Sequence, residues 1–236
     1  SLGNMVFIYI QKADYDHAMD CLEKIMTVAE EIDHQGWIAN TSGNMGLVRW
    51  RKGQYDRAME HYKKQLEISE ELDDKPGTAR ALANMGLINK RKGDKKRALE
   101  HNDKYMQISK EIGDKEGIAI AYGNSGSVYK QEGDFEKALE LFDKGIALAK
   151  KIGYKHTLPF VLLDKAETLY LSESFEKAKN TNQECLQISG EMQYEEQLFG
   201  SKVLSEKIDF ALAVDDDKKM VPMNNLEAML EEVKDE

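Results

Sequence analysis

An amide side chain recurs every forty residues along this chain of 236 residues. The equivalent positions hold Asn4, Asn44, Asn84, Asn124 and, in the last case, Asp164. Asparagine is a poor residue for a helix interior, so its recurrence in helical stretches needs a reason. Because an amide carries both a donor and an acceptor, a row of amides can bind the main chain of an extended peptide whatever its side chains are. The spacing therefore predicts a ladder of peptide-binding groups.

Basic and polar residues accompany this ladder. Helical spacing places them on or beside the stripes that carry the asparagines. The predicted peptide-binding set therefore also contains Arg51, Arg80, Arg91, Lys130 and Gln131. Guanidinium groups pair with carboxylates through two parallel hydrogen bonds, so we expect an acidic peptide or a terminal carboxylate as the ligand.

Each of these signals also has a structural alternative. The asparagines could instead bond to the adjacent helix and set the repeat spacing. The cations could stabilise helix ends beside Gly53, Gly93 and Gly133, because the helix dipole favours positive charge there. Trp50, next to Arg51, is either a hydrophobic anchor for a ligand or a packing residue. The sequence leaves these alternatives open.

The motifs of common enzymes are absent from the sequence. It contains no glycine-rich phosphate loop that ends in Lys-Ser or Lys-Thr, no His-Glu-x-x-His and no paired cysteines with zinc spacing. His61 and His101 share one position in successive repeats and are expected on exposed flanks. The run 215–217 of three aspartates lacks the glycine and glutamate of a calcium loop. We therefore expect no catalysis, no cofactor and no metal site.

Composition limits the partners and the compartment. The formal net charge is −10 with 32% charged residues, which disfavours nonspecific contact with nucleic acid or an anionic membrane. Cys21 and Cys185 belong to distant repeats, so a disulfide between them is not expected and a reducing compartment fits. No apolar stretch reaches the roughly 18 residues of a membrane span. We predict a cytoplasmic protein with protein or peptide partners, no nucleic acid and no membrane.

The period of forty residues divides the chain into repeated helix hairpins. Five units line up without insertion or deletion: 1–40, 41–80, 81–120, 121–160 and 161–200. In the second half of each unit, apolar residues recur with the spacing of an amphipathic helix. A shorter helix is expected in the first half, and Gly53, Gly93 and Gly133 fall between the two, where a left-handed residue must end the first helix.

Small and polar residues mark the helix contacts and helix starts. Ala18, Ala58, Ala98, Ala138 and Ala178 occupy one position in all five units, which suggests a close helix crossing. Recurrent glycines in the first helix, which carry a propensity penalty of roughly 1 kcal/mol, suggest close packing as well: Gly46, Gly86 and Gly126. Side chains that follow the turn are expected to cap the second helix, Gln54 less well than the others: Asp94, Asp134 and Ser174.

These residues resemble a known repeat. The pattern of Gly126, Tyr129, Gly133, Asp134, Phe135 and Ala138 resembles the tetratricopeptide repeat. The unit length is similar to that of the subclass with longer helices, which is found in Pins-type adaptors, kinesin light chains and bacterial signalling proteins. The resemblance implies an all-α fold, a right-handed superhelical solenoid of helix-turn-helix repeats whose concave face, lined by the first helices, holds an extended or helical peptide. It also implies that the asparagines bind this peptide.

The ends of the chain depart from the pattern. The chain begins partway into a first helix, so we expect an excised piece of a longer protein. Unit 161–200 has Glu173 in place of the turn glycine and Asn182 in place of the packing aromatic. In residues 201–236 we expect a degenerate sixth helix, an acidic linker and a C-terminal capping helix with apolar residues at Leu226, Met229, Leu230 and Val233. This segment carries a net charge of −5, so it either caps the last repeat or occupies the basic groove.

The sequence thus predicts a protein–protein interaction module in a larger signalling or scaffold protein, present as a monomer or weak homo-oligomer. The alternative function is a self-assembling structural scaffold in which the asparagines only set repeat packing.

Overall fold

The protein is built from consecutive α-helices. The computed structural model describes residues 2–213, and within that range it contains eleven helices and no strand. The helices are α1 (Leu2–Gln11), α2 (Tyr15–Glu31), α3 (Gln35–Arg51), α4 (Tyr55–Glu71), α5 (Lys75–Arg91), α6 (Lys95–Glu111), α7 (Lys115–Gln131), α8 (Phe135–Ile152), α9 (Leu158–Leu171), α10 (Phe175–Met192) and α11 (Glu195–Leu212). The prediction of an all-α fold of helix hairpins is confirmed.

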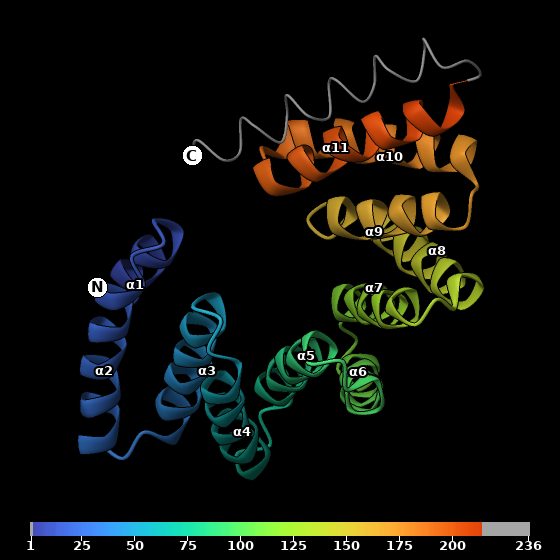
Figure 1. The fold of residues 1–236 in the computed structure, drawn as a ribbon. Coiled ribbons are helices and arrows are strands. Elements are labelled where there is room, and N and C mark those ends of the chain that lie inside the picture. The colour runs from blue at the N-terminus through green and yellow to red at the C-terminus, as the bar shows by residue number, and fades with distance from the viewer. Residues whose placement is uncertain (1, 214–236) are drawn as a thin grey trace. The chain divides into compact units, whose positions relative to one another are not determined.

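The helices form two compact units, Ser1–Asp114 and Lys115–Glu236, which we call unit 1 and unit 2. Unit 1 contains the hairpins α1–α2, α3–α4 and α5–α6, and each helix packs against the next one in the chain. Its first helices α3 and α5 lie in one layer, and its second helices α4 and α6 lie in the other (Figure 1). Helices α3 and α5 begin forty residues apart, so the sequence period is also the period of the hairpins.

Glycine ends the first helices as predicted. Gly53, Gly93 and Gly133 have φ of 70°, 75° and 78°, in the left-handed region that favours glycine. Asp94 then caps α6, since its Oδ1 accepts a hydrogen bond from the backbone N–H of Arg97 over 3.1 Å.

The capping prediction for the later repeats is confirmed once and wrong once. Asp134 caps α8 in the predicted way, because its Oδ1 accepts from the N–H of Lys137 over 3.1 Å. Ser174 makes no side-chain cap bond at the start of α10. The backbone at Ser174 has a ψ of 57°, compared with 76° at Asp94 and 73° at Asp134, and the serine hydroxyl does not reach the free amides.

The close helix crossings are also present. The five recurrent alanines are all buried: Ala18, Ala58, Ala98, Ala138 and Ala178. A Cβ added to Gly46 would lie 2.7 Å from the Tyr62 ring, and one added to Gly126 would lie 2.6 Å from the Phe142 ring. The packing interpretation is therefore confirmed at these two glycines.

At Gly86 the packing interpretation is wrong. The nearest atom to an added Cβ is the Ala98 carbonyl oxygen at 3.5 Å, which is ordinary van der Waals contact. The reason is that Asn102 occupies the position at which the neighbouring repeats carry an aromatic ring. Without that ring, the helix at Gly86 has room for a methyl group.

Unit 2 contains the hairpins α7–α8 and α9–α10, followed by α11, which packs against both α10 and α9. The helix expected in residues 201–213 is present and begins earlier, at Glu195. Buried Asn182 links α10 to α11, because its Nδ2 donates to the Ser201 carbonyl and to Ser205 Oγ, each over 2.8 Å. The acidic linker and the capping helix predicted within 214–236 lie outside the described residues.

The remaining sequence expectations concern thiols and membranes. Cys21 in unit 1 and Cys185 in unit 2 are both buried free cysteines. Within the described part of the chain, no helix is long and apolar enough to cross a membrane.

Candidate peptide-binding surface

The predicted site residues are divided between the two units. Unit 1 holds Asn4 on α1, Asn44 and Arg51 on α3, and Asn84, Arg80 and Arg91 on α5. Unit 2 holds Asn124, Lys130 and Gln131 on α7, and Asp164 on α9. All ten therefore come from first helices, six in unit 1 and four in unit 2.

Three of the predicted residues meet at a hollow between α3 and α5. This hollow, which we call the polar hollow, has a volume of about 510 Å³. Asn44, Asn84 and Arg80 line it together with Asn40, Gly43, Leu47 and Gln65. Gln65 comes from α4, so the second helix contributes to a surface that the sequence assigned to first helices alone.

The asparagines at the polar hollow do not make the bonds that the spacer alternative requires. Asn44 is exposed and Asn84 is half-buried. Among residues 2–213, neither side chain has a hydrogen-bond partner, and neither bonds to the adjacent helix. Their donors and acceptors therefore point to a space in which a ligand could meet them.

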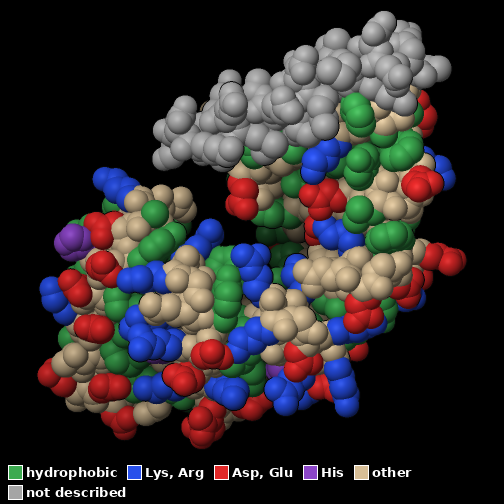
Figure 2. Space-filling view, in the orientation of Figure 1, with side chains coloured by type: hydrophobic (Ala, Val, Ile, Leu, Met, Phe, Trp, Pro, Cys, Tyr) green, Lys and Arg blue, Asp and Glu red, His purple; other side chains and the backbone are tan. Residues whose placement is uncertain are grey.

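The arginines of unit 1 are oriented by uncharged groups. Arg80 donates from Nη2 to Oδ1 of Asn40 over 2.9 Å. The Arg51 guanidinium lies 5.2 Å from the centre of the Trp50 ring. Within the described residues, neither arginine pairs with a carboxylate, so their positive charge is not neutralised there. Figure 2 shows Lys and Arg side chains interspersed with Asp and Glu over the face of unit 1 in this view.

Two aromatic rings, those of Tyr55 and Trp50, contact arginines of unit 1. Arg91 donates from Nε to the Tyr55 hydroxyl over 3.1 Å and also lies over the Tyr55 ring. Trp50 is half-buried and packs against the cluster that contains Ala58 and Met85. Trp50 thus packs within the repeat, and its ring also orients Arg51.

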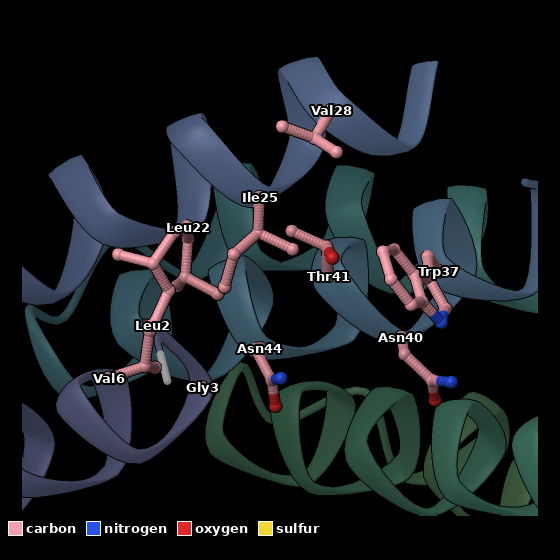
Figure 3. Close-up of a pocket in the computed structure, with 10 residues that line it drawn as sticks. All are labelled: Leu2, Gly3, Val6, Leu22, Ile25, Val28, Trp37, Asn40, Thr41 and Asn44. Atoms are coloured by element: carbon pink, nitrogen blue, oxygen red, sulfur yellow. The ribbon is translucent and has the colours of Figure 1, made fainter. Parts of the chain in front are cut away.

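A second hollow in unit 1 is apolar and was not predicted. It has a volume of about 420 Å³ and lies between α1, α2 and α3. Its lining consists of Leu2, Gly3, Val6, Leu22, Ile25, Val28, Trp37, Asn40, Thr41 and Asn44. In Figure 3, Leu22 and Ile25 extend from α2 into this apolar hollow, whereas Asn40 and Asn44 extend from α3 away from them. The two hollows share these asparagines.

In unit 2, two of the four predicted residues, Lys130 and Asp164, bind each other. Lys130 Nζ donates to Asp164 Oδ1 over 2.5 Å and to Glu167 Oε2 over 2.7 Å, and Ser127 Oγ donates to Asp164. Burial alone would lower the pKa of Lys130, but the carboxylates of Asp164 and Glu167 outweigh it, and the pKa is raised. Lys130 therefore remains positively charged, and this charge is paired with the carboxylates of Asp164 and Glu167.

The other site residues have fewer contacts. Asn124 is half-buried, while Asn4 and Gln131 are exposed.

Among the residues that the structure describes, no group of three or more His, Cys, Asp or Glu side chains is placed to hold a metal ion.

Comparison with protein families agrees with this architecture. The tetratricopeptide repeat model matches residues 1–71, 37–111 and 117–191, which together make up most of the chain. No curated protein sequence matches.

Solved structures share the fold at low sequence identity. The apo form of RapI superposes with a TM-score of 0.80 at 17% identity, over 98% of this chain and 82% of RapI. A Rap protein complexed with Competence and Sporulation Factor gives 0.79 at 14% identity, over 96% of this chain and 63% of the other. NprR in complex with its cognate peptide NprX gives 0.73 at 13%, over 98% and 66%.

Proposed function

The chain belongs to the tetratricopeptide repeat family and is a protein-interaction module, and from this premise we propose that it binds an extended acidic peptide across the polar hollow of unit 1. The observation that carries this proposal is the pair Asn44 and Asn84, whose amides line one hollow and bond to no other described side chain.

The chemistry of the polar hollow fits a peptide main chain. Each asparagine offers a donor and an acceptor, and an extended peptide presents both at regular intervals. Arg80 at the same hollow supplies an unneutralised positive charge for a ligand carboxylate. The affinity then comes from hydrogen bonds between the asparagines and the main chain of the peptide. The preference for acidic residues in the peptide comes from the arginines.

The structural relatives support a peptide as the ligand class. NprR, which superposes on this chain, is in complex with its cognate peptide NprX, and the Rap protein is in complex with Competence and Sporulation Factor. The shared fold is suited to this task, and the residues that would perform it here are those of the polar hollow.

The proposal is tested with peptides selected from a random synthetic library by the full chain. Binding of a fluorescently labelled selected peptide is then compared between the wild type and the double variant Asn44→Ala, Asn84→Ala. We expect the double variant to lose on the order of tenfold or more in affinity, since two hydrogen-bonding amides are removed. Asn180→Ala, an exposed asparagine of α10, is the matched control. Equal affinity of the double variant and this control would reject the proposal.

A second candidate function, self-assembly, is favoured by one observation on α1. Ile8 is 49% exposed, whereas its equivalents Val48 and Ile88 are fully buried against the preceding second helix. The same face of α1 is thus suited to receive another helix, including one from a second copy. Sedimentation velocity over a concentration series tests this: a dimer that Ile8→Glu abolishes supports it, and a monomer at all concentrations rejects it.

A further inference from the structure

The apolar hollow and the polar hollow are equivalent places in successive repeats. Each lies between two successive first helices and includes a residue of the second helix between them. Four pairs of lining residues are related by the forty-residue period: Gly3 and Gly43, Ile25 and Gln65, Asn40 and Arg80, Asn44 and Asn84. Two of these pairs differ in chemistry: apolar Ile25 corresponds to Gln65, and neutral Asn40 corresponds to the charged Arg80.

Gln65 is unusual for a buried residue. It is only 4% exposed, and its Oε1 is buried with no hydrogen-bond partner within the described chain. Buried polar atoms are almost always paired, because an unpaired acceptor loses its bond to water without replacement. This unpaired oxygen belongs to a residue that lines the polar hollow, so it marks a place where a ligand donor would be favourable.

Gly43 makes room for this amide. A Cβ added at Gly43 would lie 2.5 Å from Gln65 Oε1 and 2.7 Å from its Cδ, so the amide packs directly against the glycine. The absence of a side chain at Gly43 on α3 thus leaves space for the Gln65 amide at the hollow that Asn44 and Asn84 also line.

We propose that the two hollows select two side chains of one bound peptide: an apolar side chain beside Ile25, and a neutral hydrogen-bond donor, an amide or hydroxyl, at Gln65. This inference rests on the proposed function. The positive charge of Arg80 in the polar hollow disfavours lysine or arginine there and leaves the neutral donors, of which Asn, Gln, Ser and Thr are the small amide and hydroxyl side chains.

The spacing of the two selected residues follows from geometry. Adjacent packed helices lie about 8–10 Å apart, and an extended chain advances about 3.3–3.6 Å per residue. The two selected side chains are therefore about two to three residues apart, and the peptide passes Asn44, which belongs to both hollows.

The test uses a positional-scanning library of acetylated octapeptides, in which each position is fixed in turn as one residue type. We expect the wild type to retain pools with an apolar residue at one position and Asn, Gln, Ser or Thr about two to three residues away. In Gln65→Met, which nearly conserves side-chain volume, the second preference should change to apolar by on the order of tenfold, while the first is unchanged. Ile25→Gln should make the opposite change at the first position.

Controls separate this inference from the proposed function. Gln187→Met, on an exposed position of α10, should keep the wild-type preferences. Thermal melting followed by circular dichroism checks that each variant is folded. If both Gln65→Met and Ile25→Gln bind the library with wild-type preferences, the inference is overturned while peptide binding stands. If the wild type retains no pool above an acetylated polyglycine control, the proposed function itself fails.

Discussion

Arg80 on α5 donates a hydrogen bond from Nη2 to Oδ1 of Asn40 on α3 over 2.9 Å. The two residues occupy one position in successive repeats, so this bond joins neighbouring first helices directly. It also orients the guanidinium of a residue that lines the polar hollow, and the remaining N–H groups of this guanidinium are donors for a ligand.

Replacement of this arginine should weaken binding of acidic peptides. We expect Arg80→Gln to lower the affinity for a library-selected acidic peptide about three- to tenfold, because one partly solvated charge-assisted contact is lost. The salt dependence of binding should also become less steep. Fluorescence titrations at several salt concentrations measure both effects, with Arg57→Gln on the exposed face of α4 as control. An unchanged salt dependence would contradict the proposed charge preference.

Two recurrent glycines should respond in opposite directions to the same substitution. Gly46→Ala would press a methyl group into the Tyr62 ring and should lower the free energy of unfolding by about 1–3 kcal/mol. Gly86→Ala has room for its Cβ and should raise it by about 0.5–1 kcal/mol through helix propensity. Urea unfolding measures both, and a shift of equal sign would contradict the packing differences described above.

The ion pairs around Lys130 should stabilise unit 2. Lys130→Met leaves the carboxylates of Asp164 and Glu167 without their cation, and we expect a loss of about 1–3 kcal/mol. Adding Asp164→Asn should restore part of this loss, since one unpaired charge is removed. Lys151→Met, an exposed lysine of α8, is the control in urea unfolding. A double variant that is as unstable as the sum of the single variants would contradict the coupling.

Acid stability should depend on Glu140. Hydrogen bonds from Lys137 and Lys144 lower its pKa from 4.5 to about 2. Because the pKa is lower in the folded chain, the charged form stabilises the protein above pH 4.5, and this contribution is lost as the pH falls toward about 2. Melting temperatures across this window should therefore fall less steeply for Glu140→Gln than for the wild type. The exposed Glu136→Gln should follow the wild type, and identical curves for all three would contradict the assignment.

The sequence predicted the helices well because their signals are local. Apolar spacing and turn glycines such as Gly53 and Gly93 act within one hairpin, and the repeat multiplies each signal. The failure at Gly86 was not local, since the space there depends on Asn102 of the following helix.

The site was predicted only in part. Helical spacing was enough to place Asn44, Asn84 and Arg80 together. Gln65 was missed because nothing in an amphipathic pattern distinguishes a solvated glutamine from one buried against a glycine of another helix. Its one sequence signal is Gly43, a glycine inside a helix with no turn to make.

The pairing of Asp164 also required the structure. The change from asparagine to aspartate is visible in the sequence, but its hydrogen bonds come from Ser127 and Lys130 in the preceding repeat. A single position gives no indication of which earlier residues its side chain will meet.

The most direct test of the central claim is a crystal structure of the full chain with a library-selected peptide. We predict an extended peptide in the polar hollow between α3 and α5, with its main chain bonded to the side-chain amides of Asn44 and Asn84. A peptide bound elsewhere, with both amides turned to the neighbouring helix, would contradict the account.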